Sequence, residues 1–113
     1  RRYIDEQLPR LLMDIARHVD VPRSPKEVTL RSMRRRWGSC STCGKIRLSL
    51  RLFGAPTDFI DYVIIHELVH LYHPHHRRSF YELLECIKPD WKEASRQLTQ
   101  HSRYLIIDHP LDH

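Results

Sequence analysis

Residues 60–71 read IDYVIIHELVHL, and this stretch contains the pattern His-Glu-x-x-His. His66 and His70 are four residues apart, a spacing that puts two side chains on one face of a helix, about 6 Å apart along its axis. Two imidazoles in this arrangement can bind one Zn²⁺ from the same side. Glu67 lies about 100° further around the helix, where its carboxylate can reach a metal-bound water without ligating the metal. The apolar residues that flank the motif predict that this helix lies in the core.

A catalytic zinc site has three protein ligands and one open position, so a third ligand must come from another part of the chain. Three histidines follow the motif directly, at positions 73, 75 and 76. On a straight helix His73 would lie about 10 Å from His66 along the axis, too far for both to hold one ion. Pro74 ends the helix, because it disfavours helical geometry in the residue before it, and the chain can then fold back. This favours His75 or His76. Of the two we expect His76 to be the ligand and His75 to be exposed.

Around this helix the sequence predicts a single α+β domain, with a short three-stranded sheet packed on the active-site helix and further helices before and after. Hydrophobic periodicity and turn residues predict helices at 3–18, 57–73, 78–87 and 90–104, and strands at 27–33, 37–41 and 45–52. Pro9 either kinks the first helix or moves its start to about Leu8. We expect residues 1–105 to form the domain and residues 106–113 to form a flexible tail.

Composition excludes several classes of protein. The chain has 41% hydrophobic and 29% charged residues, as is usual for a globular protein, and no apolar stretch long enough to span a membrane. Three cysteines are too few and too odd in number for a disulfide framework, which predicts a reducing compartment and a cytoplasmic location. Cys40 and Cys43 form a C-x-x-C pattern without a second pair, so we interpret them as two ordinary cysteines at a turn.

Charge is distributed unevenly along the chain. Residues 1–55 contain 13 Lys and Arg against 5 Asp and Glu, a net charge of +8, whereas residues 56–113 have a net charge of −3. The densest basic run is Arg34, Arg35 and Arg36. These arginines are candidate contacts to phosphate, including that of DNA, although a solvated strand and turn would have the same composition.

The predicted strand at 37–41 offers a second role beside the metal. If it is an exposed edge strand, it can pair with an extended peptide, and its first residues are then candidate substrate contacts: Trp37, Gly38 and Ser39. The alternative is a paired inner strand with Trp37 in the core. A second oxyanion donor is also expected, and three polar residues close to the motif are candidates: Tyr72, Tyr81 and His73. Glu82 and Glu85, on the following helix, are candidate hydrogen-bond acceptors for the ligand imidazoles, whereas Asp61 is poorly placed for that role.

Three segments together resemble the YgjP-like zinc metallopeptidase domain, a family that is similar to the SprT/Spartan-type proteases. They are WGSCS at 37–41, GKI at 44–46 and the extended motif at 60–71, followed by His73, His76 and Phe80. The resemblance covers nearly the whole chain, to about Leu98. It implies a zincin-type fold with a small sheet above the active-site helix. It also implies one Zn²⁺ per chain, bound by His66, His70 and His76, with Glu67 as the catalytic residue.

The sequence therefore predicts a zinc-dependent metallopeptidase acting on a protein or peptide, in which Glu67 activates the attacking water. One alternative keeps the metal site and changes the substrate to a nucleotide or phosphate ester, as the basic half of the chain suggests. Three histidines and one glutamate suit carbonyl hydrolysis better than phosphoryl transfer, which commonly uses carboxylate-rich sites. A second alternative is a DNA-associated module with a structural zinc, but a structural site would need a fourth ligand.

Overall fold

The computed structural model describes residues 2–33 and 35–101. These residues form an α+β fold, as predicted. Its helices are α1 (Arg2–Ala16), α2 (Thr57–Val69), α3 (Arg78–Ile87) and α4 (Trp91–His101), with a short 3-10 helix, η1 (Leu50–Gly54). Its strands are β1 (Glu27–Arg31), β2 (Gly38–Cys40) and β3 (Lys45–Ser49). The tail predicted at 106–113 and the predicted end of the last helix lie outside the described residues.

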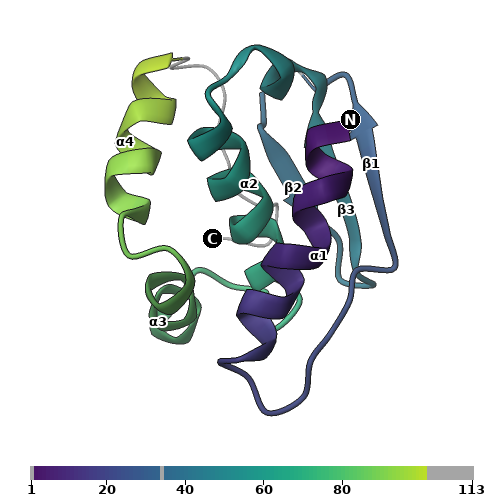
Figure 1. The fold of residues 1–113 in the computed structure, drawn as a ribbon, viewed down its shortest axis with the longest axis vertical. Helices are drawn as coiled ribbons and strands as arrows, with labels where there is room; N and C mark the ends of the chain where they lie inside the picture. The colour runs from purple at the N-terminus through teal and green to yellow at the C-terminus, as the bar shows by residue number, and fades with distance from the viewer. Residues whose placement is uncertain (1, 34, 102–113) are drawn as a thin grey trace.

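The helix that carries the His-Glu-x-x-His pattern, α2, is the centre of the fold. Ten of its thirteen residues are buried, so it is apolar on all sides rather than amphipathic. It contacts β2, β3 and the other three helices. Figure 1 shows α2 between α1 and α4, with the sheet behind α1 and α2 and α3 at the lower end of the bundle. A helix in this position holds its side chains against neighbours on every side.

The sheet has the order β1-β3-β2. β1 runs parallel to β3, with Val28 beside Ile46, and β2 runs antiparallel to β3, with Gly38 beside Leu48. β2 is therefore an edge strand of the sheet that the described residues form. Between β2 and β3 the chain turns at Gly44, whose φ of 88° is a left-handed conformation that suits glycine.

Polar side chains tie the first half of α2 to its neighbours. Asp61 accepts hydrogen bonds from the Tyr3 hydroxyl (2.8 Å) and from Gln7 Nε2 (3.1 Å), both on α1. The nearly buried Lys88, after α3, pairs through Nζ with Asp58 (2.6 Å) and with Asp90 (3.2 Å). Burial alone would lower the pKa of Lys88, but the two carboxylates outweigh it and raise that pKa above its ordinary value. These hydrogen bonds and ion pairs hold α1 and the α3–α4 connection against α2.

Three predictions about the first 55 residues are corrected. α1 runs without interruption through Pro9, so it does not begin near Leu8. The strand predicted at 45–52 ends at Ser49, and η1 takes its place. The physical reason is local, because the Ser49 hydroxyl accepts a hydrogen bond from the Arg51 amide (3.2 Å) and caps the new helix. β1 likewise ends at Arg31, two residues before its predicted end.

The end of α2 also differs from the prediction, because the helix stops at Val69 and not at residue 72 or 73. The amides of His70, Leu71 and Tyr72 bond to carbonyls three residues earlier, at 3.2, 3.0 and 3.0 Å. Bonds over three residues tighten the chain into the 3-10 geometry that is frequent at helix ends. The chain therefore leaves the helical path before Pro74 is reached, which gives the following turn more residues with which to fold back.

Candidate metal centre

Three imidazoles meet at the end of α2. His76 Nε2 lies 3.0 Å from His66 Nε2 and 3.1 Å from His70 Nε2. The three ligand atoms all lie within 4.8 Å of one another, and the group could hold a metal ion. His66 is buried in the last turn of α2, His70 is buried directly after the helix ends, and His76 is half-buried in the turn that precedes α3. The structure thus brings together the two histidines of the motif and the third one favoured by its spacing.

The proton on His70 is positioned by the same turn. His70 Nδ1 lies 3.0 Å from the main-chain oxygen of His73. A carbonyl oxygen can only accept, so Nδ1 carries the proton and donates it. The lone pair of His70 Nε2 then faces the other two imidazoles, as a metal ligand requires. His73 acts here through its main chain, while His75 is exposed, as expected.

Phe80, at the start of α3, forms the apolar side of the histidine cluster. Its ring centroid lies 4.9 Å from that of His66, 4.6 Å from that of His70 and 4.7 Å from that of His76. The phenyl group is fully buried. One aromatic ring in contact with all three imidazoles restricts their rotation. Sequence reasoning included Phe80 in the family resemblance but assigned it no role.

Glu67 is fully buried between α2 and β2. Gly38 of β2 lies against it: a Cβ atom added there would lie 3.1 Å from Glu67 Cγ and 3.2 Å from Glu67 Oε2. On the same strand, burial and then the charge of Glu67 raise the pKa of the Cys40 thiol to about 12. Gly38 was predicted as a substrate contact. Here its missing side chain leaves room for the carboxylate of Glu67.

The structure agrees in part with each interpretation of the strand predicted at 37–41, an exposed edge strand or an inner strand with Trp37 in the core. β2 is an edge strand, yet Trp37 is 2% exposed and belongs to the core. Ser39 is half-buried, between the buried Gly38 and Cys40. The strand therefore offers its main chain, and not the Trp37 ring, to anything that lies along it.

The candidate oxyanion donors lie in different places. The Tyr72 hydroxyl accepts a hydrogen bond from the Arg23 amide (2.6 Å) and donates to the Arg23 carbonyl (3.3 Å), so it faces the connector after α1. The Tyr81 ring lies 6.0 Å from the His76 ring and stacks on Trp91 at 5.1 Å. Of these two tyrosines, Tyr81 is the one that lies beside the histidine cluster.

Acidic side chains on α3 have partners other than the imidazoles. Glu82 pairs with Arg78 at 3.3 Å, and Glu85 accepts a hydrogen bond from Trp91 Nε1 at 2.5 Å. The acceptor for His70 is a main-chain carbonyl, which has no signature in the residue types.

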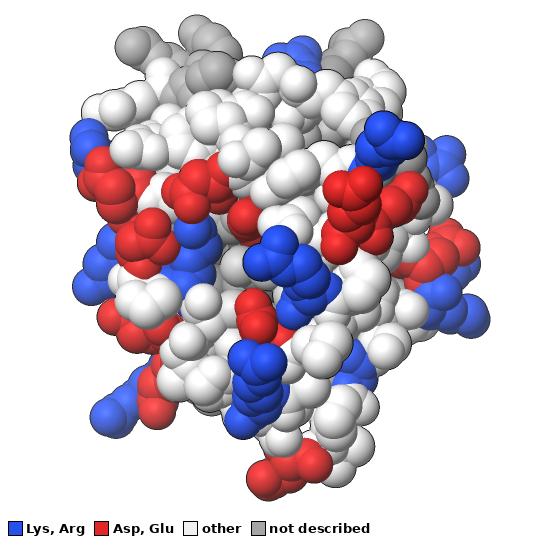
Figure 2. Space-filling view, viewed as in Figure 1, with Lys and Arg blue, Asp and Glu red and all other residues white. Residues whose placement is uncertain are grey.

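In the basic run, Arg35 is exposed and Arg36 half-buried, both just before β2, and Arg34 lies outside the described residues. Figure 2 shows blue and red side chains interspersed on the face in view, so no continuous basic surface covers that face. Cys40, Cys43 and Cys86 are free thiols.

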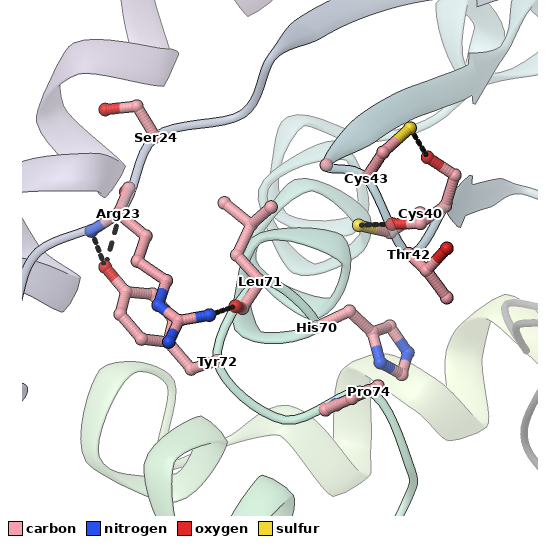
Figure 3. Close-up of a pocket in the computed structure, with 11 residues that line it drawn as sticks. Arg23, Ser24, Cys40, Thr42, Cys43, His70, Leu71, Tyr72 and Pro74 are labelled. Atoms are coloured by element: carbon pink, nitrogen blue, oxygen red, sulfur yellow. Dashed lines mark hydrogen bonds between the residues drawn. The ribbon is translucent and has the colours of Figure 1, made fainter.

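A cavity of about 480 Å³ adjoins the histidine cluster. Figure 3 shows its two sides: Cys40, Thr42 and Cys43 at the turn between β2 and β3, and Arg23 with Tyr72 opposite. His70 lies between them and lines the cavity, as does Pro74. Arg23 was not singled out from the sequence, because its place beside the metal centre depends on contacts with residues almost 50 positions away.

A compact α+β domain whose central helix and following turn gather three imidazoles beside a buried glutamate has the architecture of a metallopeptidase. The crystal structure titled the metallopeptidase zymogen of Pyrococcus abyssi abylysin has the same fold, with a TM-score of 0.78 and 20% sequence identity, over 91% of this chain and 98% of that one. The model of the family "YgjP-like, metallopeptidase domain" matches residues 1–101, and the chain belongs to this family. No curated protein sequence matches the chain. Among the described residues, no helix has both the length and the apolar character needed to cross a membrane.

Proposed function

We propose that this protein is a zinc-dependent metallopeptidase that hydrolyses peptide bonds, with zinc held by His66, His70 and His76 and with Glu67 as general base. The observation that carries the proposal is the meeting of three imidazoles, with His76 Nε2 at 3.0 Å from His66 Nε2 and 3.1 Å from His70 Nε2, next to the fully buried Glu67. Membership of a metallopeptidase family supports the reaction class.

The donor set fits zinc. Ligand nitrogens at about 2.0–2.1 Å from a tetrahedral zinc lie roughly 3.3–3.4 Å from one another, close to the 3.0 and 3.1 Å that separate His76 Nε2 from the other two Nε2 atoms. The proton on His70 Nδ1 leaves its Nε2 free to bind. Three imidazoles leave one tetrahedral position for water and substrate, which favours a catalytic over a structural site.

Bound zinc would lower the pKa of a water ligand and polarise the substrate carbonyl. In the proposed reaction, Glu67 accepts the proton of the attacking water and donates it to the leaving amine. Gly38 holds the β2 main chain against this carboxylate, and Phe80 limits movement of the imidazoles. An extended peptide would lie along the outer edge of β2 and bond to its main chain. Tyr81, beside His76, is the favoured second oxyanion donor.

The nucleotide alternative rests on the basic first half of the chain, and the DNA alternative rests on Arg34 to Arg36 and on the family's similarity to SprT-like proteases. In peptide hydrolysis the carboxylate of Glu67 has a role, because it accepts the proton of the attacking water. A structural zinc would give Glu67 no role. The cytoplasmic location predicted from the three cysteines stays a prediction.

The test compares the wild type with Glu67→Gln and with a matched control, Glu82→Gln, on the exposed side of α3. We expect all three proteins to bind about one zinc, and only Glu67→Gln to lose cleavage of casein, by roughly a thousandfold or more. Equal cleavage by the wild type and Glu67→Gln would contradict the proposal. Adding DNA to the assay tests the alternative, because DNA-dependent activity would rise with DNA and fall steeply with salt.

A further inference from the structure

The cavity beside His70 takes no part in the proposed hydrolysis. Its volume, about 480 Å³, is within the usual range of ligand-binding pockets, roughly 300–1,000 Å³. The turn between β2 and β3 contributes Ser41, Thr42 and Cys43, and the opposite side carries Arg23. Because His70 and Cys40 also line it, the cavity opens next to the metal centre and at the end of β2.

Arg23 is held in place at the cavity wall. Its guanidinium donates through Nη1 to the Leu71 carbonyl at 2.9 Å and lies over the Tyr72 ring, 5.8 Å from the ring centroid. The Tyr72 hydroxyl fixes the Arg23 main chain as well. A guanidinium has five N–H donors, and the bond to Leu71 uses one of them. Within the described part of the chain, Arg23 makes no ion pair with a carboxylate, so its charge is available to a ligand.

Two lysines lie next to the opposite wall without lining the cavity: Lys26 donates its main-chain amide to the Gly44 carbonyl (2.8 Å), and Lys45 follows Gly44 in the chain. The hydrogen bond between Cys43 and the Ser41 hydroxyl, and then the charges of Lys45 and Lys26, lower the pKa of the Cys43 thiol. Among the described residues that line the cavity there is no Asp or Glu. A cavity with an arginine in one wall, two lysines close to the opposite wall and no carboxylate among its described lining residues favours an anionic group.

We propose that this cavity is a specificity subsite that binds the carboxylate of an Asp or Glu side chain in a peptide substrate, and that Arg23 is the residue that pairs with it. The inference rests on the proposed peptidase function. A peptide that lies along β2 runs past Gly38 and Glu67 towards Cys40 and the turn that forms the cavity wall. A side chain near that end of the peptide would enter the cavity while the scissile bond lies at the histidines.

The first test is the cleavage profile of a mixed peptide library. We expect Asp and Glu to be enriched at one fixed position relative to the scissile bond. For a peptide pair that differs only by Glu or Gln at that position, the wild type should prefer Glu in kcat/KM by roughly tenfold, as loss of a charged hydrogen bond implies. In Arg23→Gln the preference should fall to about one, and in the control Arg10→Gln, on α1 away from the cavity, it should be unchanged. An unaltered preference in Arg23→Gln would overturn the proposal.

The second test does not depend on catalysis. Cys43 lines the cavity, and Cys86, exposed on α3, is an internal reference. N-acetylglutamate amide at millimolar concentration should slow alkylation of Cys43 severalfold and leave Cys86 unaffected, whereas N-acetylglutamine amide should protect neither. The effect should disappear in Arg23→Gln.

The outcomes separate the two proposals. If casein is not cleaved but the glutamate probe protects Cys43, the peptidase function fails and the anionic cavity stands. If casein is cleaved but no library position is enriched and Cys43 is not protected, the subsite proposal fails alone. Equal protection by inorganic phosphate would assign the cavity to phosphate groups and would also overturn it.

Discussion

The two halves of α2 use polar side chains in different ways. In the first half, Asp58 and Asp61 are paired with Lys88 and with Tyr3, side chains that belong to neighbouring elements and carry complementary donors. At the other end, His66 in the last turn and His70 directly after it meet a third imidazole, that of His76. The first half of α2 therefore makes ordinary structural contacts. Its end brings the nitrogen atoms of three imidazoles together.

This difference teaches where stability and function separate in a chain of this size. Polar pairs in the first half hold α1 and the α3–α4 connection in place without any ligand. The imidazoles of the last turn gain their main stabilisation when a metal joins them, because binding to the folded state alone stabilises it. Substitution of a histidine at the end of α2 should therefore alter how much zinc stabilises the protein. Substitution of a polar pair in the first half should not.

The largest expected effect is that of zinc on the free energy of unfolding. At a free zinc concentration of about 1,000 times Kd, wild type should gain roughly 4 kcal/mol, because binding stabilises the folded state by mass action. His76→Ala should lose most of this gain, while Lys88→Met, which removes the partner of Asp58 in the first half of α2, should keep it. Urea unfolding with and without zinc measures both. An equal gain in His76→Ala would move the third ligand away from His76, with His75 the next candidate.

Gly38→Ala tests the contact between β2 and the catalytic side of α2. The added Cβ would lie 3.1–3.2 Å from Glu67 and from Val63 Cγ1, so the carboxylate must shift by a few tenths of an ångström. We expect kcat to fall roughly tenfold, about 1.4 kcal/mol in activation free energy, with zinc content unchanged. Gly54→Ala is the matched control, because a Cβ there meets nothing within 4 Å. Full activity in Gly38→Ala would show that the position of Glu67 does not depend on this contact.

Lys88→Met gives the smallest effect and belongs to the other half. We expect about 1 kcal/mol of lost stability at pH 7, because the two carboxylates that Lys88 pairs with are themselves half-exposed. The folded-state pKa of Lys88 is raised, so its contribution is complete below the ordinary value of 10.5 and disappears as pH rises through the raised value. Urea unfolding at pH 7 and near pH 11 should show the difference between the two proteins shrink. A difference that grows with pH would contradict the assignment.

Much of the architecture is readable from residue types because the relevant signals are local. A helix with apolar residues around His-Glu-x-x-His is predicted by its period, and Pro74 predicts the return of the chain that brings in His76. The residues at which helices and strands end were harder to predict. Ser49 caps η1 where alternating residues favoured a strand, and α2 tightens after Val69, since hydrogen bonds of single amides decide both.

The surroundings of the site could not be predicted for a different reason. The His73 carbonyl that orients His70 is a main-chain atom, present at every residue. Contacts of Gly38 with Glu67, and of Arg23 with Leu71 and Tyr72, join parts of the chain that are 29 or more residues apart. These contacts depend on how the sheet and the connector after α1 pack against α2, and the spacing of residues in the sequence does not predict that packing. The contact of Phe80 with His76 is short in sequence, but His76 lies in the turn before α3, so helical spacing does not predict it.

The central claim is that three imidazoles, and no fourth protein ligand, hold one zinc ion. X-ray absorption at the zinc edge of the zinc-loaded chain tests it most directly. The account predicts three imidazole nitrogens and one further light atom at about 2.0–2.1 Å, with the imidazole count falling to two in His76→Ala. Sulfur at about 2.3 Å, or an unchanged imidazole count in His76→Ala, would contradict the account.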